Sequence, residues 1–597
     1  MQITASLTPR DIQDFLARVE PDKARAETLT LSLFRDRANP ELVRYLDAHG
    51  LRIALTASGF SSKILDAVKE RYGSGALDML INSPFEMADR VRGVDFSKAL
   101  ALWRRLSPDR TNTRALARFA ISDALQRRRA AGSASYAKAA LVADLRGRLL
   151  LPASALASAI DDLANAGILR SMRVNGQEHL AHRDAFASEE IIATQIRQRL
   201  GHAIEVDEFA ALDEMLRQGL ASPDQGQLEA VACALRHRVS MITGGPGTGK
   251  STVLKAIAGL ARSHKPECRI KLVSLAARVA RAIGTRTGLD ADTIHAALGL
   301  QPGQSATFGP HNPLPVDLVF VEEAFMIGNG LLADLLQALP QQCQIVFVGD
   351  PEQLPPVMEG KPAEALLRSG AVPTARLTVN HRSEARDIPV AGKRVMAGIE
   401  LTSSDNVEIH SPSSVEDALA IVKRSFLRAS ADDQTVQILT AVHDGPLGTV
   451  ALNRHVSGRD CIQVGDTVMQ TVNDRERCFF NGELAIVVKI DADGMLLRKD
   501  DGTLVKSTPA NSRDLVPAWA ISFHKSQGLE YDTVILVVSR LHRHMLGQNL
   551  LNVGITRARR HCVIVEHGRA LRMLRSVNQT SKRTTLLPQM LMDQVQP

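Results

Sequence analysis

The sequence predicts an α/β protein that has two parallel sheets, a helical N-terminal region and a small β insertion. From about residue 205 onward, short apolar runs alternate with helical segments, a pattern typical of parallel strands that helices cover on both faces. This part of the chain is too long for one such sheet, so we expect two. The expected strands are Ile270–Leu275, Leu318–Val321, Gln344–Val348, Thr435–Leu439, Thr533–Val538 and His561–Val565.

The composition excludes several classes of protein. With 45% hydrophobic and 23% charged residues, the 597-residue chain resembles an ordinary soluble globular protein. It has no apolar run of membrane-spanning length and no signal peptide, so we expect a cytoplasmic protein with no membrane contact. The 6 cysteines include no CxxC pair, which argues against zinc sites, iron–sulfur clusters and disulfides. The net charge of +7 slightly favours a polyanionic partner.

Residues 1–135 have a helical pattern with two similar glycine-centred turns. The segments Leu55–Ile64 and Val91–Leu100 each lead into a helix with an early lysine, as in a helix–hairpin–helix. Such a turn offers backbone N–H groups to a DNA phosphate without reading bases. Asp95 stands where a second glycine is usual, so an ordinary helical turn is the alternative.

Residues 136–204 have the pattern of a winged helix. Pro152–Ala166 is amphipathic, and the β-like runs Ile168–Val174 and Glu178–His182 flank Asn175-Gly176, a strong hairpin signal. A small packing domain that contacts no DNA is the alternative.

A phosphate-binding loop lies at the start of the α/β region. The segment Gly244–Thr252 fits G-x-x-x-x-G-K-[ST], between the strand candidate Val239–Thr243 and an amphipathic helix. Backbone N–H groups and the helix N-terminus favour phosphate, Lys250 can reach the β- and γ-phosphates, and Ser251 can hold Mg²⁺. The sequence therefore predicts an ATP site whose loop residues are Gly245, Gly247, Thr248, Gly249, Lys250, Ser251 and Thr252.

Acidic and basic residues elsewhere could complete this site. The apolar strand Leu318–Val321 ends at Glu322 and Glu323, of which one acid can hold Mg²⁺ and the next can position or deprotonate water. Further along the chain stand three residues suited to sensing or clamping a γ-phosphate, namely Gln353, Arg382 and Arg557.

Residues 462–513 interrupt the second α/β region. They contain the short β-like runs Asp466–Thr471, Leu484–Ile490, Met495–Arg498 and Leu504–Ser507, with turns at Asn481-Gly482 and Asp501-Gly502. This pattern predicts an inserted small β-barrel.

Taken together, these stretches resemble the superfamily 1B, RecD-like helicases over nearly the whole chain. The segment Trp519–Glu530 is the most specific match, and the others are the loop 243–252, Thr293–His295, Val321–Met326, Val348–Val357, Gly465–Gln470, Phe480–Glu483 and Leu551–Arg559. The resemblance implies two RecA-like P-loop NTPase domains, the first at 205–375 and the second at 376–461 and 514–597.

The resemblance also implies roles for individual residues. Gln227 would read adenine and Glu530 would contact the ribose. Glu322 would hold Mg²⁺, and Glu323 would be the catalytic acidic residue. Gln353, Arg382 and Arg557 would couple the γ-phosphate to domain closure. A single-strand track would include Arg278, Thr293, His295, His524, Lys525 and Ser526, and a pin hairpin near 300–313 would split the duplex.

The sequence departs from the family pattern at four places. Glu322 replaces the usual Asp, Phe325 the usual Ser and Ser383 the usual Gln, and Ser274–Arg278 lacks the usual Pro-Thr-Gly. These departures concern magnesium binding and strand contact.

The expected function is that of an ATP-driven DNA helicase, a monomeric motor on single-stranded DNA and at single-strand/duplex junctions. The 5′-to-3′ polarity and the recombination or repair partners are implied by the resemblance alone. One alternative is an ATP-gated DNA-binding subunit of a larger recombination complex that does not unwind. A conjugative relaxase–helicase is disfavoured, because the first 200 residues have no metal-like His triplet and only the tyrosines Tyr45, Tyr72 and Tyr136.

Overall fold

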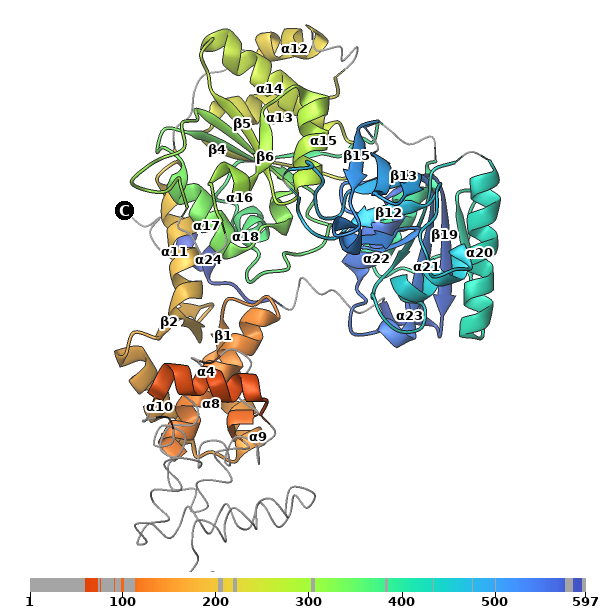
Figure 1. The fold of residues 1–597 in the computed structure, drawn as a ribbon. Helices are drawn as coiled ribbons and strands as arrows, with labels where there is room; N and C mark the ends of the chain where they lie inside the picture. Colours follow the sequence, from red (N-terminus) through yellow and green to blue (C-terminus); the bar gives the residue numbers. More distant parts are fainter. Residues whose placement is uncertain are drawn as a thin grey trace, which may run out of the picture. The chain divides into compact units, whose positions relative to one another are not determined.

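The computed structural model divides into two units, one formed by residues 1–128 and 135–183, the other by 129–134 and 184–597 (Figure 1). The residues that the structure describes are 60–73, 76, 91, 98–100, 113–201, 208–217, 223–301, 306–381, 385–432, 434–474, 476–499, 501–574 and 583–592.

Residues 136–182 of the first unit have a strand–helix–helix–strand–strand order around a three-stranded antiparallel sheet, β1-β3-β2. The predicted hairpin is present, and Asn175 and Gly176 have φ angles of 50° and 79°, as a two-residue hairpin turn requires. Its elements are α4 Ser62–Tyr72, α8 Thr113–Ala130, β1 Tyr136–Ala137, α9 Lys138–Leu149, α10 Ala153–Asn165, β2 Leu169–Val174 and β3 Gln177–His182.

The first unit contains the two regions predicted to contact DNA, the winged helix and the helix–hairpin–helix turns. Helix α10 contains two aspartates and no lysine or arginine, a composition that favours packing over DNA contact through this helix. The predicted helix–hairpin–helix turns at Leu55–Ile64 and Val91–Leu100 lie mostly outside the described residues.

The second unit contains a six-stranded parallel sheet in the order β6-β5-β7-β8-β4-β9 (Figure 1). Its strands are β4 Val239–Gly244, β5 Ile270–Ser274, β6 Ala291–Thr293, β7 Leu318–Glu322, β8 Gln344–Gly349 and β9 Thr374–Leu377. The helices are α11 Arg183–Arg197, α12 Glu208–Arg217, α13 Gln225–Arg236, α14 Lys250–His264, α15 Ala277–Thr287, α16 Ile294–Ala297, η2 Ala324–Met326, α17 Asn329–Ala338 and α18 Pro362–Ser369. The carboxyl ends of β4, β7 and β8 therefore share one edge of the sheet, where the site lies.

A second parallel sheet follows, in the order β10-β19-β18-β11-β17. Successive residues of β18 contribute to two different core clusters: Val534 and Leu536 pack with α19 and α22, and Ile535 and Val537 with α20 and α21. Burial on both faces explains the continuous apolar run. The elements are α19 Asp387–Met396, β10 Val407–His410, α20 Val415–Ala431, β11 Val436–Thr440, α21 Thr449–Ser457, β17 Ala520–Ser522, β18 Tyr531–Ser539, η4 Arg540–His542, α22 Gln548–Ile555, β19 Ala558–His567 and α23 Ala570–Leu574.

The predicted insertion is a five-stranded antiparallel sheet in the order β15-β14-β13-β12-β16. Its end at residue 513 was predicted too early, because Leu515–Pro517 pairs with β12 and so belongs to this sheet. Strands β15 and β16 lie at the two edges of this sheet and are not hydrogen-bonded to each other. The expected closure of the sheet into a barrel therefore stays a prediction. The elements are β12 Thr467–Gln470, β13 Leu484–Asp491, β14 Gly494–Lys499, β15 Leu504–Ser507, η3 Asn511–Asp514 and β16 Leu515–Pro517.

Three further predicted boundaries were wrong. The boundary at 375 cuts β9, which pairs with β4 of the first sheet. Helix α11 belongs to the second unit from residue 184 onward, not to the winged region. The C-terminal segment with α24, Leu587–Met592, packs on α18 of the first α/β domain, because its leucines Leu587 and Leu591 need an apolar surface to bury them.

A buried carboxylate anchors this C-terminal segment. Glu189 on α11 is 0% exposed and accepts hydrogen bonds from Asn329 Nδ2 at 3.0 Å, from Leu586 N at 2.8 Å and from the Thr585 hydroxyl. Burial, with a smaller effect of the nearby Glu359, raises the pKa of this carboxyl to about 7. The three hydrogen-bond donors act in the opposite direction and lower the pKa.

This pKa predicts a pH-dependent stability. The folded state holds the Glu189 proton to higher pH than the unfolded state, so the free energy of unfolding falls as the pH rises from about 4.5 to about 7. The difference amounts to at most about 3 kcal/mol. We expect Glu189→Gln to flatten the pH dependence of the melting temperature between pH 5 and 8. An equal pH dependence in wild type and variant would contradict this assignment.

Within the described part of the chain, no helix is both long and apolar enough to span a bilayer.

Candidate nucleotide and strand site

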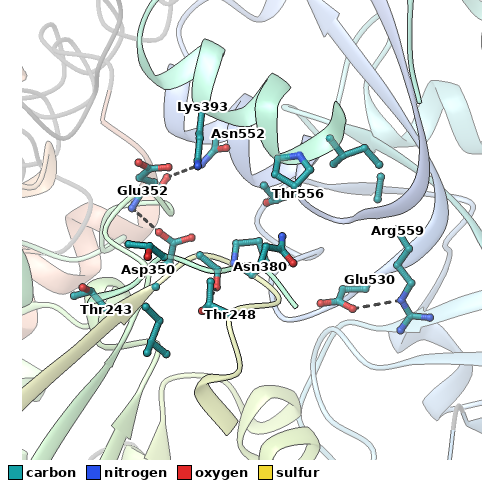
Figure 2. Close-up of a pocket in the computed structure, with 18 of the residues that line it drawn as sticks. Thr243, Thr248, Asp350, Glu352, Asn380, Lys393, Glu530, Asn552, Thr556 and Arg559 are labelled. Carbon is teal, nitrogen blue, oxygen red and sulfur yellow. Dashed lines mark hydrogen bonds and ion pairs between the residues drawn. The ribbon is translucent and has the colours of Figure 1, made fainter. Parts of the chain in front are cut away.

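A cavity of about 570 Å³ lies between the two parallel-sheet domains of the second unit (Figure 2). The first domain contributes the phosphate-binding loop, the end of β8 and the segment after β9. The second contributes α19, the start of β18 and the end of α22. Residues that line it include Gly244, Gly245, Thr248, Asp350, Glu352, Asn380, Lys393, Glu530, Asn552, Thr556 and Arg559.

The loop has the geometry of an anion site. Gly247 and Gly249 have φ angles of 76° and 83°, which a side chain would strain, and α14 begins directly afterwards at Lys250. A Cβ on Gly245 would meet no atom within 4 Å, so this side of the loop is open. The helix N-terminus and the loop N–H groups thus favour a phosphate.

Lys250 is the first residue of α14, directly after the loop. Its Nζ donates to the carbonyl oxygens of Gly244 at 2.7 Å and Gly245 at 2.8 Å, which hold the ammonium over the loop. Ser251 and Thr252 form the first turn of α14 and are half-buried.

The two adjacent acids lie where β7 ends. Glu322 is 3% exposed, and its Oε2 accepts a hydrogen bond from the Glu323 backbone N at 3.1 Å. Burial and then the neighbouring Glu323 raise the pKa of Glu322 to about 7. Glu323 has a left-handed backbone with φ of 53°, a strained conformation for a non-glycine residue of the kind that gathers at functional sites.

Charges of both signs surround Glu323. Burial raises the pKa of the Glu323 carboxyl, and the nearby Asp350 raises it further. The positive charges of Lys250 and Arg557 and a hydrogen bond from Gln353 lower it. Arg557 of the second domain is 5% exposed and donates to the carbonyls of Val553 at 3.1 Å and Leu529 at 3.2 Å. The structure therefore brings Lys250, Glu323, Gln353 and Arg557 together, whereas Arg382 lies outside the described residues.

Sequence reasoning missed Asp350. This residue directly follows β8, is 5% exposed, and accepts a hydrogen bond from the Glu352 backbone N at 2.9 Å (Figure 2). Burial raises the pKa of its carboxyl, and Lys250 and Arg557 lower it. Asp350 could have been predicted from its position directly after an apolar strand, because the same pattern identified Glu322.

The two residues expected to contact the nucleoside, Glu530 and Gln227, have different surroundings in the structure. Glu530 lines the cavity and pairs with Arg559 at 3.4 Å (Figure 2). Gln227 is 0% exposed, and its contact with adenine stays a prediction. Its amide takes part in a helix cap, in which Oε1 accepts a hydrogen bond from Asp224 N at 3.2 Å.

A smaller cavity of about 170 Å³ lies beside Glu323, and three of the six predicted strand-contact residues line it. Arg278, His524 and Lys525 line it, together with Asn481 and Gly482 of the insertion. Arg278 Nη1 donates to Gly482 O at 2.9 Å, and Lys525 Nζ donates to Asn481 Oδ1. Burial lowers the pKa values of His524 and Lys525.

Two predicted track residues lie on the neighbouring strand end. Thr293 pairs in register with Ser274, which lines the 170 Å³ cavity, and its hydroxyl caps α16 by accepting from Ala296 N at 3.0 Å. His295 is exposed on α16. Of the predicted pin, residues 302–305 lie outside the described part, and the N–H groups of Thr307 and Phe308 donate to Leu298 O.

Several known proteins and protein families are similar to this chain. Three families match: "ATP-dependent RecD2 DNA helicase HHH domain" at residues 47–134, "AAA domain" at 227–359 and "UvrD-like helicase C-terminal domain" at 517–565. The RecBCD enzyme subunit RecD of Mycolicibacterium smegmatis is 30% identical over 411 residues, which cover 58% of this chain and 74% of that protein. The chain belongs to the RecD-like helicases of superfamily 1B.

Other relatives of this RecD-like chain differ in length or are more distant. The ATP-dependent RecD2 DNA helicase of Deinococcus radiodurans is 35% identical over 362 residues, and the match covers 58% of this chain but 49% of that protein. The chain thus spans about half the length of that relative. A Pif1 helicase structure from Candida albicans has 16% identity and a TM-score of 0.40, with 61% of this chain and 96% of that one covered.

One track residue of the RecD-like chain was predicted wrongly. Ser526 is 0% exposed, and its hydroxyl donates to Phe523 O at 2.7 Å, so it stabilises the turn and does not face a strand. At another family position, Phe325 packs over Gly349, where a Cβ would lie 2.9 Å from the ring atom Cδ2. The larger side chain therefore fills space that the family's usual serine leaves.

The neighbouring residues Lys525 and Ser526 give a matched test of the RecD-like strand track. We expect Lys525→Ala to weaken single-stranded DNA binding uniformly across sequences and to reduce the salt slope of binding by about one, because one phosphate contact is lost. Ser526→Ala should lower stability by about 1 kcal/mol and leave the affinity unchanged. Fluorescence anisotropy at several salt concentrations measures both. A larger affinity loss in Ser526→Ala would contradict the placement.

The residues around the phosphate-binding loop could bind a magnesium ion that nucleotide phosphates also hold. Among the described residues, no group of three or more His, Cys, Asp or Glu forms a metal cage. The hydroxyl of Ser251 and the buried carboxylate of Glu322 are oxygen ligands of the kind that Mg²⁺ takes one or two of, beside nucleotide phosphates and water. Bound there, the ion would supply charge neutralisation at the β- and γ-phosphates.

Proposed function

We propose that this chain is an ATP-driven DNA helicase that moves 5′ to 3′ on single-stranded DNA and separates duplex strands. Family membership supports the helicase class; the direction of movement is carried over from the family. Recombination or repair of DNA is the proposed setting, and a monomer in the cytoplasm is the proposed working form.

The position of Glu323 supports this proposal most strongly. Its carboxylate faces Lys250 of the phosphate loop and Arg557 of the second domain, and the same residue lines the cavity that holds Arg278 and Lys525. A strand phosphate in that cavity would thus lie beside the group that acts on ATP. Strand binding and hydrolysis can be coupled through one side chain.

The chain's own groups divide the work of ATP hydrolysis. Lys250 binds the β- and γ-phosphates, Glu323 takes a proton from the attacking water, and Gln353 orients that carboxylate. Arg557 adds charge from the second domain only when the two domains are close, so the nucleotide state controls domain closure. Arg382 is proposed as a second such arginine.

The alternative is an ATP-gated DNA-binding subunit that does not unwind DNA by itself. Glu322 in place of aspartate and the altered Ser274–Arg278 segment favour it, and the M. smegmatis relative is named as a subunit of a larger enzyme. Glu323, Gln353, Asp350 and Arg557 in one cluster weigh against it.

Two assays on the wild-type protein separate these functions. A helicase should show ATP hydrolysis stimulated by single-stranded DNA and ATP-dependent strand separation of a forked duplex. Stimulated hydrolysis without strand separation would favour the subunit.

A further inference from the structure

A short turn of the first α/β domain lies against helix α22 of the second. The turn runs from Asp350 to Leu354, directly after β8, and it includes Gln353, whose side chain is hydrogen-bonded to Glu323. Leu354 is 2% exposed and packs in a core cluster whose other buried members, Val553 of α22 among them, belong to the second domain and its insertion. The end of the turn is therefore buried in the second domain.

Two asparagines of α22 bind the main chain of this turn. Asn549 Nδ2 donates to the carbonyl oxygens of Glu352 at 3.2 Å and Gln353 at 3.0 Å. Asn552 Nδ2 donates to the same Glu352 oxygen at 3.3 Å (Figure 2). The two asparagines are three positions apart and so lie on one face of the helix. They are 3% and 4% exposed, and buried amides are costly unless they are hydrogen-bonded.

Helix α19 leaves space for one of these amides. Gly392 lies in the interior of α19, where glycine is less favourable for a helix than alanine. A Cβ at this position would lie 2.5 Å from Asn552 Oδ1. The glycine thus lets α19 and α22 approach closely while Asn552 keeps its contact with the turn.

The main chain of the turn is bonded from both domains. On the side of the first domain, Asp350 Oδ1 accepts from Glu352 N at 2.9 Å and Asp350 O accepts from Gln353 N at 3.2 Å. On the side of the second domain, the asparagine amides satisfy the buried carbonyl oxygens, which have no partner strand. The direction of the Gln353 side chain therefore depends on where α22 lies.

We propose that Asn549 and Asn552 are positioning residues for ATP hydrolysis. They hold the main chain of Gln353 so that its side chain meets Glu323. Arg557 stands two residues after the end of α22, so this one helix brings both Gln353 and Arg557 to the acid. Separation of the two domains would withdraw both groups together, and hydrolysis would stop. This inference rests on the proposed hydrolysis of ATP at this site.

A double-mutant cycle with Gln353 tests the proposal. Asn549 is the residue to change, because Asn552 lines the 570 Å³ cavity and Asn549 does not. Asn549→Leu keeps a similar volume and removes both donors. The expected result is a fall of about tenfold in kcat for ATP, with KM nearly unchanged. In a Gln353→Ala background the same change should lower kcat by about twofold at most, because Asn549 acts through the Gln353 side chain.

A rescue variant and a matched control accompany the cycle. Asn549→Gln can still donate to the turn and should recover most of the lost kcat. Asn453 of α21 is the control, because it is 8% exposed and its amide also donates to two carbonyl oxygens, those of Pro517 and Ala520, each at 2.9 Å. Both acceptors lie outside the first α/β domain. Asn453→Leu should lower the melting temperature, and its effect on kcat should be the same with and without Gln353→Ala.

Melting temperatures show which variants fold, and Asn549→Ser takes the place of Asn549→Leu in the cycle if the latter does not. Equal losses of kcat from the change at Asn549 in the wild-type and Gln353→Ala backgrounds would overturn the proposal, since Asn549 would then act on stability or on another group. A wild-type kcat in Asn549→Leu would also overturn it. Absence of ATP hydrolysis in the wild-type protein would contradict the proposed function as well, whereas the two preceding results contradict this inference alone.

Discussion

Replacement of Glu323 by glutamine is expected to lower ATP hydrolysis by roughly two to four orders of magnitude, the usual effect of losing a general base. ATP binding and the grip on single-stranded DNA should remain. The isosteric amide keeps the hydrogen bond to Gln353 but cannot take a proton from water. ATPase rates and nucleotide titrations under one set of conditions measure both effects.

The matched control is the neighbouring acid. Glu322→Asp restores the family's usual residue and should keep or raise activity, since Mg²⁺ tolerates ligation through a water. If Glu322→Gln abolished hydrolysis while Glu323→Gln hydrolysed ATP normally, the two acids would have been assigned in the wrong order.

Replacement of Lys250 by alanine should abolish ATP turnover and, with it, strand separation. The ammonium lies 2.7 and 2.8 Å from two loop carbonyls, so the change removes both the charge that meets the β- and γ-phosphates and a tie across the loop. Loss of one such electrostatic group costs at least about 100- to 1000-fold in rate.

Arg262→Ala, at the exposed last turn of the same helix, serves as the control and should hydrolyse ATP normally. DNA-stimulated hydrolysis close to wild type in Lys250→Ala would contradict the placement of the nucleotide site.

The sequence allowed the central strands and the phosphate loop to be predicted because their signals are local. β7, β8 and β18 are buried on both faces and therefore read as continuous apolar runs, and the loop spacing follows from its contact with phosphate. β6 and β9 were missed because they have only 3 and 4 residues, half-buried or alternately exposed. Strands this short owe their existence to their neighbours in the sheet.

The features of the site that sequence reasoning did not predict have a common physical cause. Whether a side chain faces a cavity depends on partners distant in sequence, and no local pattern records them. Gln227 is turned inward by Asp224 and the loop, Ser526 by the carbonyl of Phe523, and Asp350 acquires its surroundings only when Lys250 and Arg557 approach. The return of the C-terminal segment to α18 is equally non-local, since Glu189 and Leu586 are far apart in the chain.

The most direct test of the account is strand separation of matched DNA duplexes that carry either a 5′ or a 3′ single-stranded tail, with ATP and Mg²⁺, alongside RNA versions of both. We expect unwinding of the 5′-tailed DNA duplex, little or no unwinding of the 3′-tailed one, and none without ATP. Unwinding of the 3′-tailed DNA alone would contradict the polarity. Failure on every DNA substrate, while single-stranded DNA still stimulates ATP hydrolysis, would contradict the helicase function.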